Sequence, residues 1–238
     1  MYILAFDSTN SSLSAALLKD KMVLQKITIN QHSIQLEKII NVFEEILTTN
    51  LIWYQDLDLI VYTAGPGSFT GVRIGLAVAK ALQITINKPI VAFNSLEIIA
   101  YKYFLKYSTS LDQIVVAIDA RANELFIANF IVENNCLKML NQPSLIELSQ
   151  MADYFSDYKK NNQPLFLAGS GKNLIAKLLK NKDFQSDEGD DDIIEADLIG
   201  LYFYEKSLIA DLVVGQNQQE AIYLRPPRIS ARKIKQKK

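Results

Sequence analysis

The sequence contains very few side chains that bind transition metals or form cross-links, with one histidine and one cysteine among 238 residues. Because His32 has no second histidine to act with it, a histidine-pair site for zinc or iron is excluded. A serine or cysteine hydrolase would have to use His32, and no Gly-x-Ser-x-Gly elbow accompanies it. Cys136 alone cannot form a disulfide within the chain. Several common hydrolase and metalloenzyme chemistries are therefore disfavoured.

Long apolar runs are also missing. The longest apolar stretch is broken by Arg73, Lys80 and Gln83, so no run reaches the ~18 residues of a membrane-spanning helix. Met1 to Asp7 lacks the basic region and apolar stretch of a signal peptide. We therefore expect a cytoplasmic protein with no membrane partner.

The near-zero net charge of −1 conceals two charged segments. An acidic run occupies residues 187–192, and residues 225–238 contain seven basic and no acidic residues. A segment of this kind gains affinity for RNA by contacting phosphates and releasing counterions. A solvated tail without a partner has the same composition, so both interpretations stay open.

The composition, 49% hydrophobic and 21% charged, is typical of a globular protein, and the length suits one large or two modest domains. The first half alternates strands and helices, which predicts a mixed sheet covered by helices, as in one actin-like (ribonuclease H-like) lobe. The predicted strands are Tyr2–Phe6, Leu13–Leu18, Met22–Ile29, Leu57–Tyr62 and Ile90–Phe93. The predicted helices are Ser33–Asn50, with Ser33 as cap, Val72–Ile86, and one that Ser95 caps.

The second half repeats this pattern loosely, since Ala117-Ile118-Asp119 matches Ala5-Phe6-Asp7. Its predicted strands are Ile114–Ile118, Leu125–Val132, Cys136–Leu140 and Leu165–Ala168, and its predicted helices are Leu148–Tyr158, Asn173–Lys180 and Asp197–Leu208. We predict an actin-like lobe at residues 1–107, a smaller second lobe at 108–215, and a C-terminal segment with the basic tail at 216–238. A single α/β domain with an irregular extension is the alternative.

The loop from Gly65 to Gly75 carries the densest group of turn residues. Glycines between a strand and a helix let backbone N–H groups approach an anion at the helix N-terminus. The loop is not a Walker A motif, because the Lys-Ser/Thr pair is missing. The alternative is a tight turn that allows close helix packing. The candidate nucleotide or anion loop comprises Asp7, Ser8, Thr9, Gly65, Gly67, Ser68 and Gly71.

Asp7 and Asp119 end the first strand of each half, where actin-like phosphotransferases hold phosphate and Mg²⁺. Aspartate is equally common as a turn former at strand ends, and no glycine follows Asp7 directly. The sequence predicts no metal site and no catalytic residue. An actin-like hydrolase or phosphotransferase acting through Asp7 and Asp119 remains the alternative function.

The helix predicted at Val72–Ile86 is apolar on all sides, and such helices are normally buried on all sides. One face must cover the sheet, and the other is expected to meet another helix or another chain, with Gly75 and Ala79 allowing close approach. Burial by the chain's own first helix is the alternative. The residues of this predicted partner interface are Leu36, Ile40, Phe43, Val72, Gly75, Leu76, Ala79 and Leu82.

Together these strings resemble the TsaB (YeaZ) family. The resemblance is carried by Ile3–Thr9, His32-Ser33, Gly65–Gly75, Asn94–Glu97, Ile118–Arg121 and Tyr223–Arg225. It is strongest over residues 1–130 and weak between about 133 and 215. The acidic run and the basic tail depart from the family pattern.

The resemblance implies an actin-like, non-catalytic subunit of the bacterial machinery that makes N6-threonylcarbamoyladenosine at position 37 of ANN-decoding tRNAs. It implies a metal-bearing TsaD-like paralogue and a TsaE-like ATPase as partners, and contact with tRNA through the complex. A homodimer is expected when the paralogue is absent. ATP or ADP is implied only at the interface with the partner, and no cofactor is assigned to this subunit alone.

Overall fold

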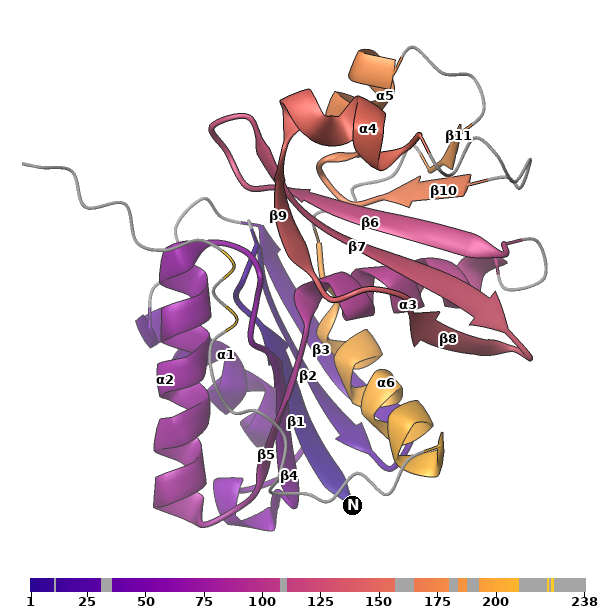
Figure 1. Cartoon of the computed structure of the whole chain (residues 1–238). Coiled ribbons are helices and arrows are strands. Elements are labelled where there is room, and N and C mark those ends of the chain that lie inside the picture. Colours follow the sequence, from indigo (N-terminus) through magenta and orange to yellow (C-terminus); the bar gives the residue numbers. More distant parts are fainter. Residues whose placement is uncertain are drawn as a thin grey trace, which may run out of the picture.

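The computed structural model describes residues 1–10, 12–30, 36–107, 111–156, 165–179, 184–187, 193–209, 222 and 224. His32 and Ser33, most of the acidic run and the whole basic segment 225–238 lie outside these residues. Within them, two mixed sheets are flanked and separated by helices (Figure 1).

The first sheet has the order β3-β2-β1-β4-β5. Its strands are β1 (Tyr2–Asp7), β2 (Ser12–Lys19), β3 (Met22–Asn30), β4 (Leu59–Thr63) and β5 (Ile90–Phe93). β1, β2 and β3 pair antiparallel, whereas β1, β4 and β5 pair parallel. Strands β1, β2 and β4 are buried almost throughout, because helices cover both faces of the sheet.

The second sheet has the order β11-β10-β6-β7-β8, and β9 also pairs with β7. Its strands are β6 (Gln113–Asp119), β7 (Glu124–Glu133), β8 (Cys136–Met139), β9 (Ser144–Glu147), β10 (Leu165–Ala168) and β11 (Phe184–Ser186). β6 occupies one edge of β7 along nearly its full length. β8 and β9 therefore share the other edge, at opposite ends.

The two sheets repeat one topology. When β9 is left out, each sheet has two antiparallel pairings followed along the chain by two parallel ones, which gives the strand order 3-2-1-4-5 in both. The predicted fold class, actin-like with two ribonuclease H-like mixed sheets, is confirmed. The sequence pattern missed β9 and β11, and because β11 is the fifth strand of the repeated order, the repeat looked incomplete.

Helices form three layers around the sheets (Figure 1). α1 (Leu36–Thr49) and α2 (Phe69–Ile86) cover the outer face of the first sheet, and α4 (Met151–Tyr154) and α5 (Lys172–Leu179) the outer face of the second. α3 (Ser95–Tyr107) and α6 (Ala196–Ile209) fill the space between the sheets. Short 3-10 helices span Tyr54–Asp56 and Leu148–Gln150.

The middle layer is crossed over with respect to chain order. α3 follows the first sheet but packs on the second, against β6, β7, β8 and β10. α6 follows the second sheet but packs on β1, β2 and β4 of the first, where Gly200 lies against Leu18. The lobe boundaries at 107 and 215 stay a prediction. Helix α6 belongs by sequence to the predicted second lobe, residues 108–215, but it lies on the first sheet.

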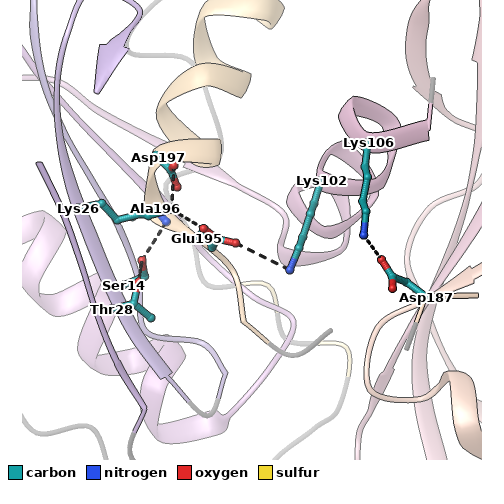
Figure 2. Close-up of polar contacts among 9 residues, drawn as sticks. All are labelled: Ser14, Lys26, Thr28, Lys102, Lys106, Asp187, Glu195, Ala196 and Asp197. Atoms are coloured by element: carbon teal, nitrogen blue, oxygen red, sulfur yellow. Dashed lines mark hydrogen bonds and ion pairs between the residues drawn. The ribbon is translucent and has the colours of Figure 1, made fainter. Parts of the chain in front are cut away.

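The start of α6 is held by polar contacts from the first sheet (Figure 2). Ala196 N donates to Ser14 Oγ at 3.0 Å, and Lys26 of β3 pairs with Glu195 and with Asp197, the latter at 3.0 Å. Lys102 of α3 lies 3.9 Å from the same Glu195. These contacts join the first sheet, α3 and the start of α6 at one point.

Two helix starts differ from the sequence prediction. α2 begins at Phe69, three residues before Val72, because the Ser68 side chain accepts a hydrogen bond from Gly71 N. At α3 the cap is Asn94 and not Ser95, since Asn94 Oδ1 accepts from Leu96 N at 2.8 Å. Ser95 is the first helical residue.

Candidate functional site

Asp7 ends β1 inside a closed group of hydroxyls. Its Oδ1 atom accepts hydrogen bonds from Thr9 N at 3.1 Å, from Thr9 Oγ1 at 2.6 Å and from the Thr63 hydroxyl. The contact to the backbone two residues ahead is the Asx-turn that aspartate forms at strand ends. Thr63 lies at the end of β4, the parallel neighbour of β1. The carboxylate is therefore fixed by two adjacent strand ends.

The Asp7 side chain is fully buried, and burial raises its pKa to about 6, against the lowering effect of the Thr63 and Thr9 hydrogen bonds. Its second oxygen, Oδ2, has no hydrogen-bond partner within the described part of the chain. A buried, unpaired carboxylate oxygen is costly when ionised. The geometry thus favours the protonated acid far more than at a surface aspartate.

The glycines of the loop after β4 lie directly against the turn that follows Asp7. A Cβ atom added at Gly67 would lie 2.3 Å from the Thr9 carbonyl oxygen, and one at Gly71 would lie 1.9 Å from that of Ser8. One added at Gly75 would lie 2.6 Å from Ser8 Oγ. The three glycines are needed because another part of the chain occupies the space of their side chains.

Hydrogen bonds join the same two segments. Ser68 N donates to the Thr9 carbonyl at 2.6 Å, and Ser8 Oγ donates to the Gly71 carbonyl at 2.9 Å. The two parts of the candidate nucleotide loop, Asp7–Thr9 and Gly65–Gly71, are thus brought together. They pack on each other. Binding of a nucleotide or anion by this loop stays a prediction.

Two residues of this cluster were missing from the sequence-based set: Thr63 and Ser95. Ser95 Oγ lies 3.0 Å from Thr9 Oγ1, and Ser95 N donates to the Gly65 carbonyl at 2.8 Å. The string Asn94–Glu97 signals this position, because Asn94 caps α3 and Glu97 accepts from Asn94 N at 3.4 Å. No comparable sequence signal exists for Thr63, because its position beside Asp7 results from the pairing of β4 with β1.

Asp119 occupies the matching place in the second sheet, at the end of β6. Its Oδ1 accepts from Arg121 N at 2.7 Å, the same Asx-turn as at Asp7. Its Oδ2 lies 3.5 Å from the Arg121 guanidinium, and the side chain is 29% exposed. The structure gives the two aspartates equivalent turns but different surroundings.

The predicted partner interface divides into two groups. Phe43, Val72, Gly75 and Ala79 are buried within this chain, and Phe43 and Ala79 belong to the core between the first sheet and its outer helices. Leu36 is exposed, and Ile40, Leu76 and Leu82 are half-buried. The interface stays a prediction, and only these four of its eight predicted residues are accessible to a partner.

The outer side of α2 is largely uncovered and mostly apolar or small. Its exposed residues include Phe69, Ala77, Ala81 and Ile84, with Ile84 81% exposed, together with Arg73 and Lys80. The Arg73 guanidinium lies 3.7 Å from the centre of the Phe69 ring. By length and composition α2 could span a membrane, but its inner side packs on β4 and β5, which accounts for the apolar residues of that side.

Comparisons with known proteins place the chain among tRNA-modification proteins. The family model for TsaD, tRNA N6-adenosine threonylcarbamoyltransferase, matches residues 23–190. A tRNA threonylcarbamoyladenosine biosynthesis protein TsaB from Buchnera aphidicola (subsp. Schizaphis graminum) is 30% identical over 162 residues, 66% of this chain and 74% of that protein. TsaB from Bacillus subtilis is 30% identical over 185 residues, 76% of each.

Among solved structures, YeaZ from Pseudomonas aeruginosa has the same fold. Its TM-score is 0.76 at 21% identity, over 94% of this chain and 99% of that one. The sequence relatives carry the assignment further than fold, because they reach 30% identity over three quarters of their own length. The chain therefore belongs to the TsaB (YeaZ) family, within the wider group that the TsaD model describes.

Proposed function

We propose that this chain is a non-catalytic scaffold or activating subunit of the bacterial complex that forms N6-threonylcarbamoyladenosine at position 37 of ANN-decoding tRNAs. Its partner is a TsaD-like paralogue that carries the metal, and a TsaE-like ATPase completes the set. The names of its relatives and the matching family model support a place in this tRNA modification. The chain alone forms a homodimer.

The observation that carries the non-catalytic role is the packing at the end of β1. In an actin-like phosphotransferase, the strand ends leave room for phosphate. Here Gly67 and Gly71 lie against the backbone of Ser8 and Thr9, and Asp7 is fully buried. The space next to these glycines is filled by the protein itself. ATP or ADP, if it acts in the complex, binds at the subunit interface.

The exposed side of α2 supports the second half of the proposal, assembly with the paralogue. The TsaD-like partner has a related fold, because one family model covers both proteins, so it presents a matching helix pair. Small side chains at Ala77 and Ala81 permit a close helix contact, and Ile84 offers apolar area to bury. Charged Arg73 and Lys80 flank this strip.

Reconstitution tests the proposal. The TsaD-like and TsaE-like proteins are expected to modify tRNA only when this chain is added, and Ala81→Glu is expected to abolish their complex while leaving the fold intact. Ala152→Glu is the matched control, because Ala152 is exposed on α4, which covers the outer face of the other sheet. Normal modification without this chain would refute the scaffold role. Normal modification with Ala81→Glu would refute the α2 interface.

The rival function, a hydrolase or phosphotransferase using Asp7 and Asp119, is favoured by one observation. Asp7 has a raised pKa and an unpaired Oδ2, as a general acid or base would. Its complete burial argues against contact with a substrate. Full activity of the reconstituted complex with Asp7→Ala and Asp119→Ala would eliminate this rival.

A further inference from the structure

All the charge on α2 is positive. The helix contains Arg73 and Lys80, and no aspartate or glutamate occurs in its 18 residues. α2 lies at the outside of the molecule (Figure 1), and both residues are exposed on the side that faces away from the first sheet. Lys80 forms no ion pair with any residue that the structure describes. The surface proposed to bind a partner is therefore basic as well as apolar.

The two cations alternate with small and apolar side chains along one stripe of α2. The stripe consists of Arg73, Ala77, Lys80 and Ile84, which are all exposed and are separated by steps of four, three and four residues. Side chains with this spacing align on one face of a helix. Arg73 and Lys80 are thus about two turns, or about 10.5 Å, apart along the helix axis. A helix that packs on the stripe meets both cations and the small or apolar residues between and beyond them.

A second copy of this chain is a poor occupant of the stripe. In a symmetric pair the same surface meets itself, so each residue lies opposite the one that the two-fold axis relates to it. Two antiparallel α2 helices that cross near Ala77 place Arg73 of each copy opposite Lys80 of the other. A parallel pair places Arg73 opposite Arg73 and Lys80 opposite Lys80. Like charges meet in both arrangements, which disfavours the contact.

A second copy could instead place its α1 on the stripe. The exposed residues of α1 include Glu37, Glu44 and Glu45, which would pair with the two cations. Apart from Leu36 in the first turn, however, the exposed residues of α1 are polar, because its apolar residues are turned to the first sheet. This contact gains ion pairs but buries little apolar area. A second copy therefore satisfies either the charges of the stripe or its apolar residues, and not both.

We propose that Arg73 and Lys80 select the protein that binds to α2. They disfavour a second copy and favour a TsaD-like partner whose facing helix carries two carboxylates about two turns apart beside small or apolar residues. The proposal rests on the proposed function, which supplies the TsaD-like protein. In such a complex the carboxylates pair with the cations while Ala77 and Ile84 are buried. The homodimer of the chain alone is then the weaker complex, and the partner displaces it.

The test compares two double variants of the full-length chain. In the first, Arg73→Gln and Lys80→Gln remove both cations from α2. In the second, the matched control, Lys21→Gln and Lys177→Gln remove the same charge from exposed positions in the β2–β3 turn and on α5. Affinity for the TsaD-like protein is measured by calorimetry at about 50 mM and about 500 mM salt. Self-association is measured by sedimentation equilibrium in the same buffers.

We expect the two associations of the first variant to change in opposite directions. Its binding to the TsaD-like protein should weaken by roughly three- to tenfold at low salt and lose most of its salt dependence, because two exposed ion pairs are removed. Its self-association should tighten by a similar factor, because the like charges are gone. The control variant should match the wild type in both measurements. A change of both associations in the same direction, or of neither, would overturn the proposal.

Failure of the proposed function is detected separately, with the Ala81→Glu variant. If this variant leaves the complex with the TsaD-like protein intact, or if the wild-type chain does not bind that protein, the α2 interface is wrong and the charge selection falls with it. If Ala81→Glu abolishes the complex while the first variant keeps wild-type affinity and salt dependence, the interface stands and only the charge selection is refuted. Arg73→Glu with Lys80→Glu should bind the TsaD-like protein more weakly still than the glutamine variant, and equal or tighter binding would contradict carboxylates on the facing helix.

Discussion

The ends of β1 and β6 form the same turn, but the aspartates at these two ends have different surroundings. Asp7 and Asp119 both close an Asx-turn onto the residue two positions ahead. Asp7 is then sealed by Thr63 and by the glycine loop after β4, whereas Asp119 stays partly exposed and lies beside Arg121. Local turn chemistry is therefore the same in both sheets, and the loop after the fourth strand determines the surroundings of the carboxylate.

The loops after β4 and β10 show how this difference arises. Gly67 and Gly71 press on the backbone of residues 8 and 9, beyond the end of β1. Gly169 and Gly171 press on Ala117, two residues before Asp119, and Ser170 between them accepts a hydrogen bond from Asp119 N at 3.0 Å, so the second loop contacts the backbone of Asp119 while its side chain stays 29% exposed. The carboxylate of Asp7 is therefore fully buried beneath the first loop, whereas that of Asp119 stays partly exposed beside the second.

The largest expected effect comes from replacing by alanine one glycine that follows the fourth strand of each sheet. Gly71→Ala puts a Cβ atom 1.9 Å from a backbone oxygen, which can move only with β1, so we expect the free energy of unfolding to fall by about 3 kcal/mol. Gly171→Ala meets the end of the Leu125 side chain at 2.7 Å, which can rotate, and the Cβ and carbonyl oxygen of Ala117 only at 3.0 and 3.1 Å, so about 1 kcal/mol is expected. Urea unfolding measures both. Equal losses would show that the two loops are equally tight.

The next effect is a difference in pH dependence. Burial raises the folded-state pKa of Asp7 from 3.8 to about 6, so its contribution to stability is fully present below pH 3.8 and is lost as the pH rises through 6. The total is roughly 3 kcal/mol. Asp7→Asn cannot ionise, so we expect it to remove this loss of stability between pH 4 and 7.

The measurement is urea unfolding at several pH values across that range. Asp119→Asn is the matched control, because it removes a carboxylate from the equivalent strand end and leaves Asp7 in place. An unchanged slope of unfolding free energy against pH in Asp7→Asn would show that Asp7 ionises normally in the folded protein.

The smallest effect compares ion pairs in the two sheets. Lys26 pairs with Glu195 and Asp197 at the start of α6, and its side chain is 31% exposed. Lys138 pairs with Glu133 within the second sheet, where both side chains are about half exposed. We expect Lys26→Gln to lower the free energy of unfolding by about 1 kcal/mol and Lys138→Gln by less than about 0.3 kcal/mol. Thermal unfolding at low and high salt checks this, and equal effects would contradict a special role for Lys26.

The sequence predicted most elements because their signals are local. β5 and β10 match at both ends, and short apolar or β-rich runs located the first three strands to within two residues. β9 (Ser-Leu-Ile-Glu) and β11 (Phe-Gln-Ser) were missed because, unlike the equally short but wholly apolar β5 and β10, they contain few apolar residues, and they are stabilised by pairing with β7 and β10. Strand pairing is a property of the folded chain, so short edge strands leave little trace in the sequence.

The candidate site was predicted in the same uneven way. Asp7 to Thr9 and Gly65 to Gly71 were chosen from composition, and the structure brings them together. Thr63 and Ser95 come from strands and helices that meet only after folding. The burial of Phe43 and Ala79 could not be predicted either, because helical periodicity does not distinguish a face that covers a sheet from one that awaits a partner.

The crossed-over position of α6 affects how the protein is made. During synthesis the strands of the first sheet are complete at residue 93, but the helix that covers their inner face ends at residue 209. At ~5 to 20 residues per second, the ribosome needs roughly 6 to 23 s to make the 116 residues between these points. During that time Ala5, Ala16 and Leu18 have no covering helix. The nascent chain therefore exposes an apolar sheet face that chaperones would bind and through which it could aggregate.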